Sequence, residues 1–452
     1  MEFSRELLEF FLGGLLLFVI IFQFKQSIKN RKSISLIDIS IWITGTSFGL
    51  APFILILYGG QLPEANLINV FLSYLGIFLF IIGLLAIKKN LKKSLLKKAF
   101  LIDIIKNVDR VNQKVVLFSY SIFFLVRAIF AFDYGIFTSG SATAERMQSL
   151  PYYLFVFRSL LDLVSWGCIL WSIVKILSNK KLLLLPAIIL IIETLMIFFR
   201  GRRHMLYLVF LFIYIYILLG YRINLRILIP SALILIILIN FIFPAFITFR
   251  EISLNIKNPD LIENYSTSYY SLLQTGIDRS RFESNIAQRV YINSWNIDII
   301  SKSSLVDGLK GQALISSILF VIPRPLLPFK GLLKDPEYLI NYNLGLGLND
   351  SPSNWPAYGF ADFGLFGGLI YGIFLGIILS FLQYFAAYNF NKFPFFSFTI
   401  LGSVSFIAFF IEETPSAVFS VFRDIIIMYI VLIVISLFLR KKVKIVNGSS
   451  KV

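Results

Sequence analysis

The stretch that decides the fold is "FADFGLFGGLIYGIFLG", residues 360–376, in which five glycines lie among large apolar side chains. The chain then stays uncharged to about residue 384, a length that matches the roughly 30 Å hydrocarbon core of a bilayer. Glycines in such a run let two helices approach closely inside a membrane. The stretch therefore predicts the start of a membrane-spanning helix that packs against a neighbour through its glycines.

Composition extends this prediction to the whole chain. Of 452 residues, 58% are hydrophobic and only 15% are charged, and the mean hydropathy is +0.82. A soluble core cannot hide that much apolar surface, so we expect the long uncharged runs to be bilayer spans. The single cysteine, Cys168, excludes a disulfide framework and thiolate metal sites.

The apolar runs predict an all-α polytopic membrane protein with about eleven transmembrane helices. The first eight spans occupy residues 1–248, a long external loop follows at 249–358, and residues 359–452 contain three more spans and a basic tail. The predicted spans are 7–24, 36–58, 65–87, 115–133, 153–177, 182–199, 205–220, 227–248, 359–384, 394–411 and 417–439.

Lysine and arginine set the orientation of these spans. One alternating set of loops is strongly basic and includes "KQSIKNRK" at 25–32, "KKNLKKSLLKK" at 88–98 and the tail "RKKVKIVNGSSK" at 440–451. The other short loops are nearly free of positive charge, so the basic set is predicted to be cytoplasmic. This places the N-terminus outside and the C-terminus in the cytoplasm. It also explains the net charge of +17 without a nucleic-acid partner.

The segment "GQALISSILFVIPRPLLPF", residues 311–329, is an alternative twelfth span. Its uninterrupted apolar stretch is only about ten residues long and ends at Pro-Arg-Pro, and counting it would place the basic tail outside. We therefore expect an interfacial helix near 311–323, which either lies on the membrane surface or dips back into the protein.

The hinge "FFRGRRHML", residues 198–206, departs from the charge rule, because span counting places Arg200, Arg202, Arg203 and His204 on the external face. Guanidinium groups bind phosphate oxygens in pairs, and the start of the following helix adds free N–H groups. The hinge thus suits a pyrophosphate at headgroup depth. His204, the only histidine, is a candidate for proton transfer or phosphate contact. The alternatives are arginines that meet lipid phosphates and a structural histidine.

The external loop contains further candidates. Tyr291 and Trp295 in "YINSWN", and Trp355 and Tyr358 in "SPSNWPAYGF", combine aromatic rings with amides, a pattern typical of carbohydrate contact. The alternative is an ordered loop with ordinary turn chemistry.

Charged residues inside the predicted spans should face the interior of the helix bundle and pair with one another. Arg158 and Asp162 are four residues apart on one span, which predicts a local ion pair. The charged residues concerned are Arg127, Arg158, Asp162, Glu193, Arg423 and Asp424. The chain contains no Walker motif and no His/Cys/Asp cluster with metal-ligand spacing, so we expect no metal and no cofactor.

In "FFRGRRHML" and "SPSNWPAYGFADFGLFGGLI", residues 351–370, the chain resembles the Wzy-type O-antigen and capsule repeat-unit polymerases. The first stretch resembles the family's Arg/Gly element at the end of a span, and the second resembles its loop exit into a Gly-rich span. The architecture is similar over the whole chain. The Arg-rich loop repeats of some members have no clear counterpart, which leaves the choice among Arg279, Arg281 and Arg289 open.

The resemblance implies a bacterial inner-membrane protein with a glycosyltransferase-C-like helical arrangement, shared with O-antigen ligases. It implies that the growing chain is transferred from undecaprenyl pyrophosphate to a hydroxyl of the next lipid-linked repeat, without a nucleotide sugar or a metal. The implied partners are the lipid-linked oligosaccharide, membrane lipids and a chain-length regulator.

Preorganised cations would stabilise the departing pyrophosphate. Arg200, Arg202 and Arg203 are the first candidates for this role, and Arg250 and Arg289 the second. His204, Asp350 and Glu412 compete for the role of base toward the acceptor hydroxyl. An O-antigen ligase that uses the same donor, a flippase or exporter of lipid-linked sugar, and a structural scaffold are the alternative functions.

Overall fold

The computed structural model shows a protein built from α-helices and short 3-10 helices. The residues that it describes are 2–29, 34–57, 62, 65–91, 101–134, 152–179, 183–195, 202–221, 233, 292–303, 308–323, 326–346, 353–409 and 414–448. These ranges contain no β-strand, so the predicted all-α fold class is confirmed for them.

The helices follow the predicted spans closely. Every predicted span has a helix at its position except 227–248, of which the structure describes only residue 233. The α-helices are α1 (Glu2–Lys29), α2 (Leu36–Leu57), α3 (Leu67–Leu91), α4 (Leu101–Lys106), α5 (Gln113–Tyr134), α7 (Tyr152–Asn179), α8 (Leu184–Leu195), α10 (Arg202–Leu218), α15 (Asn293–Ser303), α16 (Gln312–Val321), α17 (Pro336–Asn343), α18 (Trp355–Phe363), α19 (Gly367–Asn389), α20 (Pro394–Phe409) and α21 (Pro415–Gly448). The 3-10 helices are η3 (Val108–Arg110), η6 (Pro328–Leu332) and η7 (Gly364–Phe366).

In the described part of the chain, six helices are long and apolar enough to cross a membrane, judged by length and composition. They are Ser4–Lys29, Leu36–Ile56, Leu67–Asn90, Val156–Asn179, Trp355–Asn389 and Pro415–Leu437. Helices α8, α10 and α20 are apolar but contain only 12, 17 and 16 described residues, fewer than the roughly 20 that a crossing needs. The protein is thus an α-helical membrane protein, while the number of eleven spans stays a prediction.

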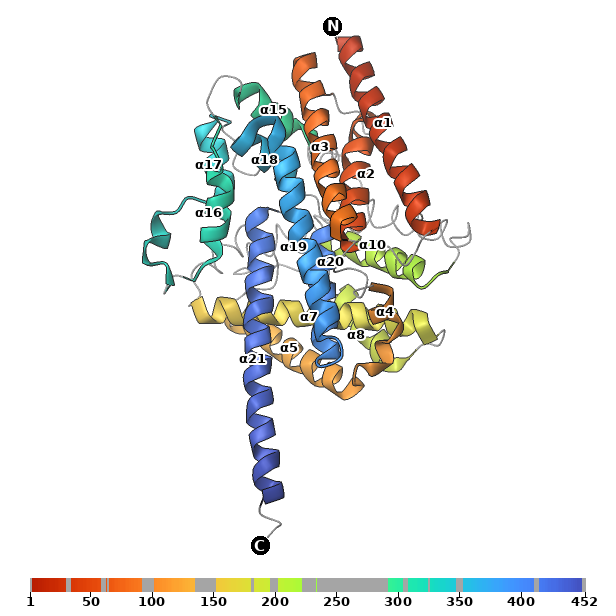
Figure 1. The fold of residues 1–452 in the computed structure, drawn as a ribbon, viewed down its shortest axis with the longest axis vertical. Coiled ribbons are helices and arrows are strands. Elements are labelled where there is room, and N and C mark those ends of the chain that lie inside the picture. Colours follow the sequence, from red (N-terminus) through yellow and green to blue (C-terminus); the bar gives the residue numbers. More distant parts are fainter. Residues whose placement is uncertain are drawn as a thin grey trace, which may run out of the picture.

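Helices α3 and α19 lie side by side and approach each other through glycines (Figure 1). A Cβ atom on Gly368 would lie 2.3 Å from the carbonyl oxygen of Gly76, and one on Gly372 would lie 2.2 Å from that of Phe80. Such distances are too short for any side chain. Since these contacts advance in the same direction along both chains, the two helices run parallel. The close glycine contact predicted from residues 360–376 is confirmed, and we call it the glycine seam.

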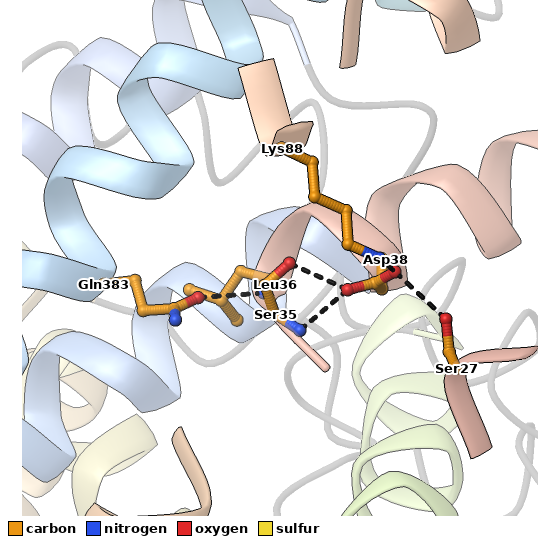
Figure 2. Close-up of polar contacts among 6 residues, drawn as sticks. All are labelled: Ser27, Ser35, Leu36, Asp38, Lys88 and Gln383. Atoms are coloured by element: carbon orange, nitrogen blue, oxygen red, sulfur yellow. Dashed lines mark hydrogen bonds and ion pairs between the residues drawn. The ribbon is translucent and has the colours of Figure 1, made fainter. Parts of the chain in front are cut away.

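Asp38 joins three helices at one end of the seam (Figure 2). Its carboxylate accepts hydrogen bonds of 2.8 Å from the backbone N–H and the hydroxyl of Ser35. The bond from the Ser35 N–H is the one that the acid of a capping box accepts at the start of a helix. Lys88, near the end of α3, pairs with the same carboxylate, and Ser27 of α1 donates to it at 3.4 Å. The Asp38 carboxylate is fully buried, so these partners replace the water that it loses.

Contacts between distant segments agree with the predicted alternation of the loops. The side-chain oxygen of Gln383 in α19 accepts a hydrogen bond of 3.1 Å from the N–H of Leu36 (Figure 2). Arg110 donates to the side chain of Asn391 at 2.8 Å. Each contact joins two segments that were predicted to share the cytoplasmic face. The absolute orientation stays a prediction.

Helix α7 runs across α19 and α21 rather than along them, and α5, α8 and α10 lie in the same crossing layer (Figure 1). It meets α20 where a Cβ atom on Gly402 would lie 2.4 Å from the carbonyl oxygen of Trp166. The sequence prediction treated all spans alike and did not anticipate this crossing.

The buried charge of the crossing layer is Glu193 of α8. Its carboxylate accepts hydrogen bonds from the hydroxyl groups of Tyr120 at 3.0 Å and Ser165 at 3.1 Å, and the Arg127 guanidinium lies 3.8 Å away. The side chain of Glu193 is 1% exposed and that of Arg127 is 19% exposed. The prediction that these two charges face the interior and pair is confirmed.

The other two predicted pairs differ in outcome. Arg423 and Asp424 of α21 pair at 2.7 Å, as predicted. For the local pair between Arg158 and Asp162, the structure shows that Nη1 of Arg158 is buried without a hydrogen-bond acceptor. This pair stays a prediction.

Helix α16 lies where an interfacial helix was predicted near 311–323, and it contacts α17, α18 and α21. Its place at the membrane interface stays a prediction. Asp362 of α18 caps its first turn, since its carboxylate accepts the N–H groups of Ala313 at 2.9 Å and Leu314 at 3.0 Å. The Tyr371 hydroxyl donates to the same carboxylate at 2.6 Å. This carboxylate therefore fixes α16 to the start of the glycine seam.

Candidate functional site

The predicted pyrophosphate hinge lies at the start of α10. The helix begins at Arg202, so Arg202, Arg203 and His204 occupy its first turn. The structure describes the backbone of these three residues and not their side chains, and Arg200 lies outside the described residues. The first turn of a helix has free N–H groups and the positive end of the helix dipole. The backbone at this position is therefore suited to an anion.

Tyr207, one turn after Arg203, anchors this end of α10. The side chain is fully buried, and its hydroxyl donates to the carbonyl oxygen of Gly402 at 2.8 Å. Its ring packs edge-on against Trp166 of α7 at 4.9 Å and Phe406 of α20 at 5.2 Å between centroids. The hinge is thus attached to the point where α7 crosses α20.

The end of α20 reaches the same place. The ring of Phe409 lies 6.0 Å from that of Tyr207 and 5.8 Å from that of Tyr214 between centroids. Glu412 follows Phe409 by three residues in the sequence. The described ends of the segments that carry the hinge and Glu412 therefore meet. The candidates that lie outside the described residues are Asp350, Glu412, Arg250, Arg289 and Tyr291.

The other three predicted sugar-contacting rings are buried. The exposed fractions of Trp295, Trp355 and Tyr358 are 0%, 3% and 0%. Trp295 packs edge-on against Tyr358 at 5.7 Å between ring centroids and donates its indole N–H to Asn341 at 3.2 Å. In this structure the three rings contribute packing, and contact between them and a sugar stays a prediction.

A cavity of about 370 Å³ lies where residues 308–310 meet the end of α18. This volume is in the range of about 300–1,000 Å³ that small-molecule sites occupy. The ring of Phe363, which is 38% exposed, supplies apolar surface, while Ser303 and Lys310 supply a hydroxyl group and a cation. The combination of an apolar ring and a few polar groups is typical of small-molecule sites.

Lys310 has φ of 52°, a left-handed conformation that is uncommon outside glycine. Two backbone hydrogen bonds of 2.9 Å hold the segment there, from the N–H of Leu309 to Ala361 and from the N–H of Lys310 to Asp362. Strained backbone of this kind persists only where its surroundings fix it. The wall of the cavity is therefore well defined.

Sequence reasoning missed Asp362 and Lys310. The signal available for Asp362 was its position in the glycine-rich stretch, because an acid at the start of a span must find hydrogen-bond partners. Lys310 gave no such signal. Among the described residues, no group of three His, Cys, Asp or Glu side chains could hold a metal ion.

Compared with known proteins, the chain matches no family model, no curated protein and no solved structure.

Proposed function

We propose that the protein is a polymerase that joins undecaprenyl-pyrophosphate-linked oligosaccharide repeats at the outer face of a bacterial inner membrane. The growing chain moves from its lipid carrier to a hydroxyl group of the next lipid-linked repeat, and polyprenyl pyrophosphate leaves. In this proposal the chain has eleven spans in a glycosyltransferase-C-like arrangement, with the N-terminus outside and the C-terminus in the cytoplasm.

The observation that carries the proposal is the sequence cluster of three arginines and one histidine at 200–204, of which Arg202, Arg203 and His204 begin α10, a helix that Tyr207 attaches to α7 and α20. Cleavage of the anomeric C–O bond leaves negative charge on the pyrophosphate, which fixed guanidinium groups and helix N–H groups stabilise. His204 and Glu412 are the two candidate bases whose segments meet at Tyr207 and Phe409. Either would accept the proton of the acceptor hydroxyl.

The cavity beside α18 supports the sugar side of the proposal. Its volume of about 370 Å³ suits a sugar residue, and Phe363 offers a partly exposed ring. Lys310 and Ser303 add hydrogen-bond donors for sugar oxygens.

Arg203→Lys tests the proposal, because lysine keeps the charge and loses the paired donors. We expect polymer formation from purified lipid-linked repeats in vesicles to fall about a hundred-fold, the usual effect of removing one transition-state donor. Arg110→Lys is the matched control, since Arg110 lies in η3 and contacts Asn391 at the surface. Equal polymer from Arg203→Lys and Arg110→Lys would refute the role of the hinge.

A deletion strain separates the proposal from its alternatives. Loss of a polymerase leaves single repeats attached to the cell surface. Loss of a ligase leaves lipid-linked polymer unattached, and loss of a flippase leaves single repeats inside the cell.

A further inference from the structure

The segment from α16 to α17 folds as a hairpin that lies alongside α21, at the left of Figure 1. α16 runs from Gln312 to Val321, the chain turns through η6, and α17 returns from Pro336 to Asn343. The hydroxyl of Ser316, halfway along α16, donates to the carbonyl oxygen of Lys334 at 2.8 Å, which joins the two arms.

The turn of the hairpin exposes large apolar side chains. The exposed fractions of Leu326, Phe329 and Leu332 are 74%, 53% and 84%. Ile315 on α16 is also 55% exposed. Leu326, Phe329 and Leu332 form the apolar tip of the hairpin, and exposed apolar side chains gathered in this way mark a surface that contacts lipid or protein.

The depth of this tip follows from its contact with α21. The guanidinium of Arg423 donates to the carbonyl oxygen of Val321, the last residue of α16, at 3.2 Å. Arg423 lies eight residues into α21, about 12 Å along the helix axis. One leaflet of the hydrocarbon core is about 15 Å thick. If the apolar part of α21 spans the bilayer, the end of α16 therefore lies at the depth of the acyl chains.

Backbone carbonyl groups at the end of α16 have the hydrogen-bond donors that they need among acyl chains. Besides the bond from Arg423 to Val321, the Lys330 ammonium donates to the carbonyl oxygen of Ile322 at 2.9 Å. Two cations thus satisfy successive carbonyl groups at the end of α16, where no water would be available.

The returning arm has the composition of a membrane interface. The rings of Tyr338 and Tyr342 stack with centroids 5.6 Å apart, and both are more than half exposed. The Lys334 ammonium lies 4.1 Å from the centroid of the Tyr342 ring, so its side chain points along α17, away from the tip. Tyrosine rings beside a lysine that extends toward the headgroups are typical of the membrane interface.

We infer that residues 312–323 and 326–346 belong to a re-entrant hairpin whose tip, Leu326, Phe329 and Leu332, inserts among the acyl chains of one leaflet, with Lys334, Tyr338 and Tyr342 at the headgroups. Helix α16 of the hairpin contacts α21, on which Ile426 and Ile430 are 41% and 54% exposed. In this arrangement the hairpin anchors its neighbours in the chain, α15 and α18, to the membrane. This inference is independent of the proposed polymerase activity.

Spin labels on single cysteines test the insertion. In a Cys168→Ser background, Leu332→Cys labels the tip and Asn343→Cys labels the exposed far end of the same hairpin as the matched control. The full-length protein is reconstituted in phosphatidylethanolamine and phosphatidylglycerol vesicles, with oxygen or a water-soluble nickel chelate present on both sides of the membrane.

We expect the label at 332 to collide with oxygen several-fold more than with the nickel chelate, and the label at 343 to show the reverse preference. A label at 332 that is as accessible to nickel as the label at 343 would overturn the inference. Protection of position 332 from both reagents would also overturn it, because a protein surface and not lipid would then cover the tip.

Discussion

The two halves of the helical bundle are held together in different ways. In one half, α3 and α19 run parallel and touch along several turns. Gly368 and Gly372 of α19 lie against backbone atoms of α3, and Gly376 lies against the Ile87 side chain. In the other half, α5, α7 and α8 cross that direction and are joined by the buried carboxylate of Glu193. Parallel helices share a long contact, whereas crossing helices touch over a short distance.

This difference shows which kind of substitution should destabilise each half. The glycine seam depends on the absence of side-chain volume, since even a methyl group on Gly372 would overlap Phe80. The crossing half depends on three hydrogen-bonding or charged partners of one acid, Tyr120, Ser165 and Arg127. The first half should therefore respond to size, and the second to loss of polar partners.

Breaking the seam should have the largest effect. Gly372→Leu places a branched side chain where the Phe80 carbonyl oxygen already lies, so we expect a loss of stability above about 3 kcal/mol, the upper part of the usual overpacking range. The fraction of folded protein recovered in detergent measures it. Gly14→Leu on α1 is the control, since a Cβ there meets nothing within 4 Å. Equal recovery of the two variants would show that the contact between α3 and α19 does not require a glycine at position 372.

Removing the acid of the crossing half should have the next largest effect. Glu193→Ala leaves Arg127 and two hydroxyl groups without their shared acceptor, and we expect a loss of about 2 kcal/mol, reduced by the partial exposure of Arg127. Glu193→Gln keeps an oxygen acceptor for Tyr120 and Ser165 and should lose about half as much. Thermal unfolding in detergent measures both. A loss from Glu193→Gln as large as that from Glu193→Ala would show that charge alone holds this half together.

The smallest effect is expected at Asp298, which belongs to neither half and lies on the exposed side of α15. Partial loss of water around the carboxyl group raises its pKa above the ordinary value, while Lys302 opposes the shift. Since the folded pKa exceeds the unfolded one, the ionised acid costs stability above the folded pKa, and the cost disappears as pH falls below about 3.9. Asp298→Asn should therefore slightly raise the unfolding temperature at pH 7, with the gain shrinking on acidification. A gain that grows at low pH would contradict this sign.

Much of the fold could be predicted from local sequence. The positions of the helices follow from the apolar runs, and the glycines of residues 360–376 identify one face of the seam. The partner helix α3 could not be predicted, because spacing within one helix says nothing about which distant helix packs on it. The crossing of α7 was missed for the same reason, since its composition is that of an ordinary span.

The candidate site was predictable to a lesser degree. The clustering of Arg202, Arg203 and His204 is visible in the sequence, and α10 begins where the hinge was expected to start a helix. The attachment of the hinge by Tyr207 to Gly402 depends on a contact between residues nearly 200 positions apart. Trp355 and Tyr358 look the same in sequence whether they face a sugar or the protein interior.

The glycine seam also constrains how the protein is made. Gly76 and Gly368 are about 290 residues apart, so at a synthesis rate of about 5–20 residues per second α3 precedes α19 by roughly 15–60 s. During this interval the ribosome has not yet produced α19, whose glycines pack against the α3 face at Gly76 and Gly83. Nascent α3 is therefore made well before its partner in the seam, and the seam can close only after α19 has been synthesised.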